Sequence, residues 1–165
     1  MWFQNLYKKI KESFWYWYEK RGELRDLKLR DVKQAHIISQ IALFTQEKTN
    51  EYIYIKNIKL LHPVNRISAL KKIKEREVVL KQNQEKIVQR EAISRENLDK
   101  YIPSITPMKV IKFKNRQYVI WEGNGRLVAL EKVFGKNLMI EVEEHVLNEE
   151  GQDILTRLLE DLFSN

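Results

Sequence analysis

The amino-acid sequence predicts an α/β (α+β) fold: a small mixed sheet with helices, flanked by an N-terminal helical extension and a C-terminal amphipathic helix. Segments rich in β-forming residues alternate with helical segments between residues 51 and 146. Both ends of the chain carry apolar residues at helical spacing. Hydrophobic residues make up 43% of the 165 residues, with only 5 Gly and 3 Pro, so a folded core is expected. We therefore expect an extension (1–50), a central domain (51–146) and an acidic C-terminal helix (147–165).

The first 18 residues carry nearly half of the aromatic residues, at spacings that predict a helix with a large apolar face. Its large side chains are Trp2, Phe3, Leu6, Tyr7, Ile10, Phe14, Trp17 and Tyr18. Arg21-Gly22 is a suitable end, because glycine commonly follows the last turn of a helix. We expect this face to pack against the body of the protein; a membrane interface or a protein partner are the alternatives.

A second helix is expected from Asp26 to Phe44, followed by a turn at Thr49-Asn50. Its predicted apolar stripe is Val32, Ala35, Ile38, Ile41 and Ala42. His36 lies on or near this stripe, where a lone histidine is more often a core residue than a metal ligand.

The central domain is expected to begin with a strand and a long helix. Pro63 marks a bend between them, and the inner face of the helix should carry Ile67, Leu70, Ile73 and Leu80. A break is expected near Asn83, and Ser94 is a good N-cap for a short helix. The expected elements are strand 51–60, helix 67–89, a helix opened by Ser94, loop 103–107, strand 108–113, turn 114–116, strand 117–121, helix 126–134 capped by Gly135, strand 138–142 and helix 149–163.

Charge and residue types bound the function. The net charge is +7, but residues 141–165 carry −7, which leaves +14 on the rest of the chain. A basic body favours anionic partners, and an ordinary solvated, lysine-rich surface is the alternative. The absence of Cys excludes disulfides, thiolate nucleophiles and cysteine-based zinc sites. No apolar stretch is long enough for a membrane span and no secretory signal is evident, so a cytoplasmic protein is expected.

The segment Glu122-Gly123-Asn124-Gly125-Arg126 joins a predicted strand to a predicted helix. The first N–H groups of a helix are unsatisfied and favour an anion, glycines let the backbone approach a phosphate, and arginine offers a planar fork of donors. Glu122 is a candidate to orient a metal ion, a water or a hydroxyl. The alternative is a plain strand-to-helix turn in which the glycines relieve strain, because no Walker or dinucleotide pattern is present.

The order of segments resembles that of the ParB/sulfiredoxin-like superfamily. The likeness covers somewhat over half the chain. It rests on an opening strand with a Pro/Arg-containing segment, a Thr-Pro strand, and a strand that leads through a Gly-x-x-Arg turn into a helix. These stretches are Ile55-Lys56-Asn57-Ile58 through His62-Pro63-Val64-Asn65-Arg66, Ile105-Thr106-Pro107-Met108-Lys109-Val110, and Tyr118 to Leu130.

The turn matches the family pattern only in part. Gly123 and Arg126 match the shared glycine and final arginine, and Glu122 takes the place of an acidic residue found in some members. Asn124 stands where sulfiredoxins have their cysteine, which excludes sulfiredoxin chemistry. Gly125 replaces a histidine or arginine, which puts catalysis in doubt but leaves phosphate binding possible. The chain after residue 146 is too short for the DNA-binding and dimerisation domains of a partition protein.

The resemblance implies a nucleotide-binding protein, with a nucleoside triphosphate and Mg²⁺ as the implied ligand and hydrolase or phosphotransferase activity left open. Gly123, Asn124, Gly125 and Arg126 would hold the phosphates, Glu122 would act as a base or orient a metal, and Arg66 and Thr106 would approach the same cleft. The alternative is a non-catalytic module that binds DNA, RNA or a protein. Its nucleic-acid candidates, Lys71, Lys72, Lys74 and Arg76, also look like any solvated helix face.

Overall fold

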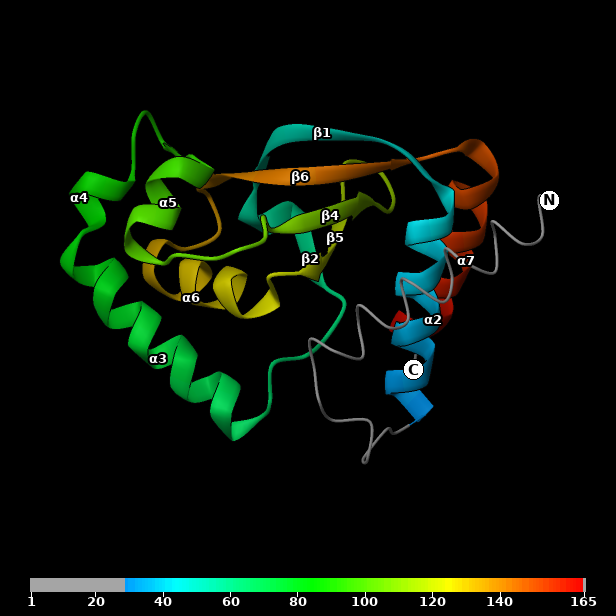
Figure 1. The fold of residues 1–165 in the computed structure, drawn as a ribbon, viewed down its shortest axis with the longest axis horizontal. Helices are drawn as coiled ribbons and strands as arrows, with labels where there is room; N and C mark the ends of the chain where they lie inside the picture. Colours follow the sequence, from blue (N-terminus) through cyan, green and yellow to red (C-terminus); the bar gives the residue numbers. More distant parts are fainter. Residues whose placement is uncertain (1–28, 165) are drawn as a thin grey trace. The chain divides into compact units, whose positions relative to one another are not determined.

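The computed structural model describes residues 29–164 and divides the chain into two compact units (Figure 1). One comprises residues 48–145, and the described part of the other comprises residues 29–47 together with 146–164. The aromatic helix expected over residues 2–18, with its stop at Arg21-Gly22, lies outside the described residues.

The sheet is mixed and has the order β1-β6-β4-β5-β2, with β3 paired to β6. Strands β2 and β5, β4 and β6, and β3 and β6 pair in parallel, whereas β4 and β5 form an antiparallel hairpin. The predicted fold class, a mixed sheet with helices, is confirmed. The strands are β1 (Thr45–Tyr54), β2 (Ile58–Leu60), β3 (Ala92–Ile93), β4 (Lys109–Lys112), β5 (Tyr118–Glu122) and β6 (Met139–Leu147).

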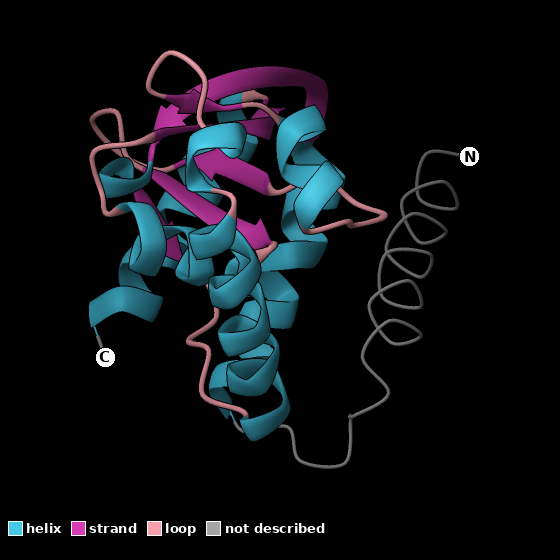
Figure 2. Cartoon of the chain, turned by 90° about the vertical axis from the view of Figure 1, so that its left-hand side faces the viewer, coloured by secondary structure: helices cyan, strands magenta, loops and turns pink. Residues whose placement is uncertain are grey.

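Four helices of the 48–145 unit pack with the sheet around one core (Figure 2). They are α3 (Ile67–Gln82), α4 (Gln84–Ile87), α5 (Arg95–Tyr101) and α6 (Asn124–Phe134). Alternate residues of the strands point into this core because side chains on a strand alternate between faces. The buried cluster includes Val110, Ile120, Ile140 and Val142 from the strands, and Ile73, Leu80, Leu98, Leu127 and Leu130 from the helices. Helix α3 packs directly against α6, which brings the two elements of the candidate site together.

The other unit pairs helix α2 (Leu29–Phe44) with helix α7 (Glu149–Ser164). Helix α7 buries Leu155, Leu159 and Leu162, as expected for an amphipathic C-terminal helix. An ion pair of 2.9 Å joins Lys33 Nζ to Asp161 Oδ2 across the pair.

The buried face of α2 differs from the predicted stripe. Gln34, Ile37, Ile38 and Ile41 are buried, whereas Val32 is 50% exposed and Ala42 is exposed. His36 is also exposed, so its assignment as a core residue was wrong. The buried set follows i, i+3, i+4 and i+7, the spacing of one helix face, and that face is centred on Ile37–Ile38 instead of on Ala35.

Three further predicted elements differ from the structure. Thr49 and Asn50 lie within β1 and form no turn, because β1 starts at Thr45 and pairs with the distant strand β6. The predicted strand 51–60 is interrupted by a 3₁₀ turn, Ile55–Asn57, before β2. Strand β6 also continues beyond residue 142, to Leu147.

Three local features lie where the sequence predicts them. The long helix breaks at Asn83, the Ser94 hydroxyl accepts from the N–H of Asn97 at 3.2 Å, and Gly135 ends α6 with φ 79°. On α3, however, the predicted inner face is only half right. Ile73 and Leu80 are buried, but Ile67 is 87% exposed and Leu70 is 39% exposed. No helix within residues 29–164 is long and apolar enough to cross a membrane.

Candidate anion-binding site

The site is built on the glycine that ends β5 and starts α6. Gly123 has φ 94° and ψ 19°, a left-handed conformation, and is the N-cap of α6 without any side-chain cap. A Cβ on Gly123 would lie 2.7 Å from the Met108 Cγ and 3.1 Å from the Arg126 Nη2. Glycine is therefore required both by the backbone angle and by Arg126, whose guanidinium folds back over the turn.

The second glycine has a different role. Gly125 lies in the first turn of α6 and has an ordinary helical backbone. A Cβ there would lie 3.1 Å from the Nη1 of Arg76, which comes from α3. The two glycines thus give room to two guanidinium groups, one from α6 and one from α3, at the positively polarised end of α6.

Arg126 is more deeply buried than a side chain that lies open to a phosphate group would be. Its exposed fraction is 4%. The sequence suggested a side chain open to a ligand, whereas Arg126 is held inside the unit among charged groups. Burial lowers the pKa of Arg126. Glu122 and Asp99 raise this pKa, whereas Arg76 and Arg95 lower it. Among residues 29–164, the guanidinium makes no hydrogen bond and no ion pair.

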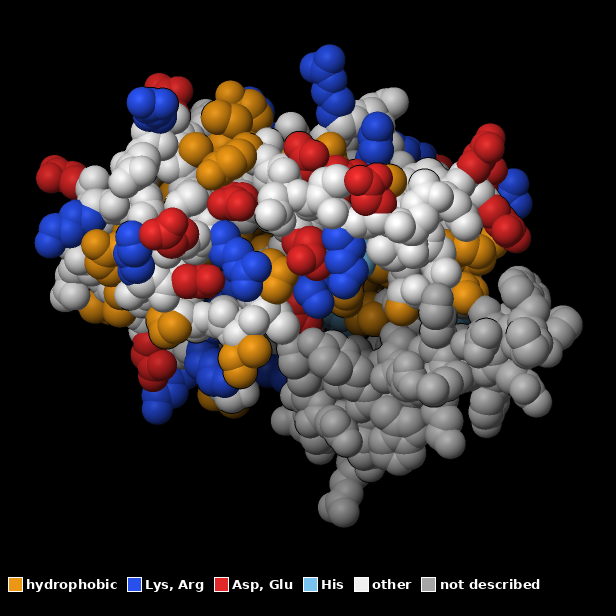
Figure 3. All heavy atoms as spheres, turned by 45° about the horizontal axis from the view of Figure 1, so that its top comes forward, with side chains coloured by type: hydrophobic (Ala, Val, Ile, Leu, Met, Phe, Trp, Pro, Cys, Tyr) orange, Lys and Arg blue, Asp and Glu red, His pale blue; other side chains and the backbone are white. Residues whose placement is uncertain are grey.

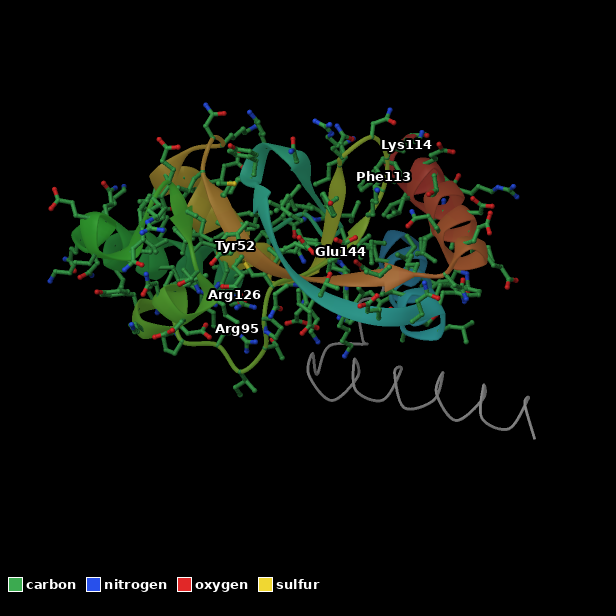
Figure 4. The ribbon with its side chains drawn as sticks, turned by 90° about the horizontal axis from the view of Figure 1, so that it is seen from above. Tyr52, Arg95, Phe113, Lys114, Arg126 and Glu144 are labelled. Carbon is green, nitrogen blue, oxygen red and sulfur yellow. The ribbon has the colours of Figure 1, made fainter. Side chains whose placement is uncertain are left out.

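Charges of both signs surround Arg126, and the carboxylates do not offset the burial that lowers its pKa. Two carboxylates, Glu122 and Asp99, act on it together with two other arginines, Arg76 and Arg95. Figure 4 labels Arg126 and Arg95, which lie next to one another in that view. An ionised group that is buried without a matching counter-charge is costly, since it has lost water and gained no equal partner. Arg76 is a second arginine whose charge is poorly compensated. Its half-burial lowers its pKa more than Glu75 raises it.

Asn124 presents a further donor beside the turn. Its side chain is 6% exposed, and its Oδ1 accepts from the backbone N–H of His62 at 3.4 Å. Its buried Nδ2 has no hydrogen-bond partner in the described part of the chain. A buried amide donor without an acceptor is uncommon and calls for an explanation, for which a bound anion or water suffices.

Glu122 and Thr106 meet on the other side of the turn. The Thr106 Oγ1 donates to Glu122 Oε1 at 3.2 Å, so the structure brings these two predicted site residues together. Arg95 and Asp99 form an ion pair of 3.5 Å on α5. The sequence did not single out either residue, because they are some thirty positions before the turn and no local pattern marks them.

The arginine of α3 that reaches the turn is Arg76. Arg66 is the exposed N-cap of α3, ten residues or about 15 Å of helix before Arg76. Arg76 had been grouped with the solvated lysines of α3, yet it is half-buried against α6. Lys71, Lys72 and Lys74 are exposed, as a solvated face requires. The signal that separates Arg76 from them is its helical spacing from the buried Ile73 and Leu80.

No cluster of three or more His, Asp or Glu side chains suited to a metal ion occurs within residues 29–164. No protein-family model matches the chain, and no curated protein or solved structure is significantly similar to it.

Proposed function

We propose that the first turn of α6, with Arg126 and Arg76, binds a phosphate group of a nucleotide. The carrying observation is Arg126, which is 4% exposed and whose guanidinium has no hydrogen bond or ion pair among residues 29–164. Burial lowers the pKa of Arg126 more than Glu122 and Asp99 raise it. A bound anion would supply hydrogen-bond acceptors and further negative charge. The free N–H groups at the start of α6 and the Nδ2 of Asn124 would complete its hydrogen bonds.

The nucleotide part of the proposal is supported by the order of segments. Its likeness to ParB/sulfiredoxin-like domains implies a nucleoside triphosphate with Mg²⁺ at the Gly-x-x-Arg turn. Glu122 is the proposed base or metal-orienting group if the site turns over its ligand. The hydroxyl of Thr106 donates a hydrogen bond to Glu122, which supports a role for this carboxylate as an acceptor toward a hydroxyl group.

The test is calorimetric titration of the full chain with inorganic phosphate, ATP, ADP, CTP and GTP, with and without Mg²⁺. The informative variant is Arg76→Gln, because Arg76 is only half-buried and its removal leaves no large cavity in the core. Loss of hydrogen bonds to a charged group costs about 1.5–3 kcal/mol, so affinity should fall roughly 10–150-fold. Lys81→Gln removes the same charge from an exposed position of the same helix and should leave affinity nearly unchanged.

Two results would contradict the proposal. One is a wild-type chain that binds neither phosphate nor any of the nucleotides at millimolar concentration. The other is an equal loss of affinity in Arg76→Gln and Lys81→Gln, which would indicate a diffuse charge effect instead of a site. Turnover is tested separately with Glu122→Gln, which should keep nucleotide affinity and abolish any phosphate release that the wild type shows.

A further inference from the structure

The outer face of α3 is an exposed apolar stripe. Ile67, Leu70 and Val78 are 87%, 39% and 55% exposed, although aliphatic side chains of this size are usually buried. They are spaced by three and eight residues, which places them on one side of a helix. Three of the seven exposed large hydrophobic residues in the described part of the chain lie on this one stripe.

Lysines occupy the same side of the helix. Lys71, Lys74 and Lys81 are exposed and lie four, seven and fourteen residues after Ile67, which are the spacings of a single helix face. In Figure 3, basic and apolar side chains, with acidic ones among them, lie at the lower left, the side on which Figure 1 draws α3. The outer face is thus both basic and apolar along most of a 16-residue helix, about 24 Å long.

We propose that the outer face of α3 docks on an anionic lipid surface. A helix that lies in the membrane interface buries aliphatic side chains just below the headgroups while its lysines meet the anionic lipids. The face of α3 offers both at once. The mainly basic charge of the chain outside residues 141–165 favours the same partner over neutral lipid.

The two other partners of a basic helix fit less well. Nucleic acid is bound chiefly through phosphate contacts from basic and polar side chains, which gives no role to three exposed aliphatic residues. A protein groove that binds an amphipathic helix takes up the apolar face of that helix. Helix α3 is fixed by packing its inner residues Ile73 and Leu80 into the core beside α6, so only its outer face is available, and a flat surface suits it better.

The test uses co-sedimentation of the full chain with vesicles of phosphatidylcholine, with and without 30% phosphatidylserine. Each lysine near such a surface changes partitioning about fivefold, so Lys71→Gln/Lys74→Gln/Lys81→Gln should weaken binding to the anionic vesicles about a hundredfold. The matched control neutralises three exposed lysines on other elements, Lys100→Gln/Lys114→Gln/Lys136→Gln, and should retain most of the binding.

The aliphatic contribution is tested by a second matched pair. Val78→Ser should weaken binding to anionic vesicles severalfold, whereas Val32→Ser, which changes a valine of similar exposure on α2, should not. Both residues are exposed, and circular dichroism should show that both variants fold.

The outcomes are decisive in either direction. The proposal is supported if the α3 variants lose binding to anionic vesicles while their matched controls keep it. It is overturned if the wild type shows no preference for anionic vesicles, or if the α3 triple variant binds them as well as its control, since another segment would then be responsible. It is also overturned if the wild type ignores vesicles but binds a DNA duplex in a manner that requires Lys71, Lys74 and Lys81. Phosphate or nucleotide titration of the same variants should be unchanged, which separates this proposal from the one above.

Discussion

Gly123 and Gly125 stand two residues apart, yet they should respond in opposite ways to the same added methyl group. At Gly123 an alanine must adopt φ 94° and place its Cβ 2.7 Å from the side chain of Met108 and 3.3 Å from the Met108 Cα. At Gly125 the backbone is helical, and the closest atom is the Nη1 of Arg76 at 3.1 Å, the far end of a flexible side chain.

The expected magnitudes follow from these contacts. A left-handed conformation costs an alanine about 1–2 kcal/mol, and overpacking against Met108 adds about 1–3 kcal/mol, so Gly123→Ala should lower the free energy of unfolding by roughly 2–5 kcal/mol. Gly125→Ala improves helix propensity by up to about 1 kcal/mol and requires only a small shift of Arg76. Its stability should therefore stay within about 1 kcal/mol of the wild type.

Urea unfolding monitored by circular dichroism measures both variants, and titration with inorganic phosphate measures the site. Gly125→Ala should keep the fold but weaken phosphate affinity, because its Cβ shifts the Arg76 guanidinium away from the turn. The reasoning is refuted if Gly123→Ala is within 1 kcal/mol of the wild type, or if Gly125→Ala destabilises the protein as much as Gly123→Ala does.

Three other predictions concern single residues. Arg126→Met removes a charge whose pKa burial lowers more than Glu122 and Asp99 raise it, so we expect a ligand-free protein at least as stable as the wild type in urea, with no phosphate binding; a strong destabilisation would show that these carboxylates already compensate Arg126. Burial lowers the pKa of His145, although its hydrogen bond to Glu143 opposes this, so the folded state binds fewer protons than the unfolded chain. Wild-type stability should therefore fall as the pH drops below 6.5, and His145→Gln should flatten this dependence in pH-dependent thermal melts; an equal slope in both would count against it. Ser94→Ala should cost about 0.5–2 kcal/mol in urea unfolding through loss of the α5 cap, whereas Ser164→Ala, at an exposed position near the end of α7, should be close to neutral.

Features that depend on a few adjacent residues were predictable from the sequence. The Ser94 cap, the break at Asn83 and the end of α6 at Gly135 follow from local hydrogen bonds and backbone angles. The first turn of α6 was located for the same reason, although the helix begins at Asn124, two residues before the predicted start.

Features that depend on tertiary partners were not predictable in this way. Thr49-Asn50 reads as a turn, but pairing of β1 with β6 places both residues in a strand. The apolar residues of α3 are spread around the helix, so only the contact with α6 shows that Ile73 is inside and Ile67 outside. Arg76, Arg95 and Asp99 join Arg126 only after α3, α5 and α6 have packed, which is why the sequence supplied the turn but not its charged surroundings.

The glycine N-cap of α6 has a consequence for amide exchange. Most helices begin with a serine, threonine or aspartate whose side chain accepts from the first N–H groups, but Gly123 has no side chain to do so. The amides of Asn124, Gly125 and Arg126 precede the first backbone bond of the helix, from Leu127 N–H to the Gly123 carbonyl at 3.1 Å. These amides should exchange their hydrogens with solvent faster than the rest of α6, and an anion bound at the turn would act as the absent cap and slow them selectively.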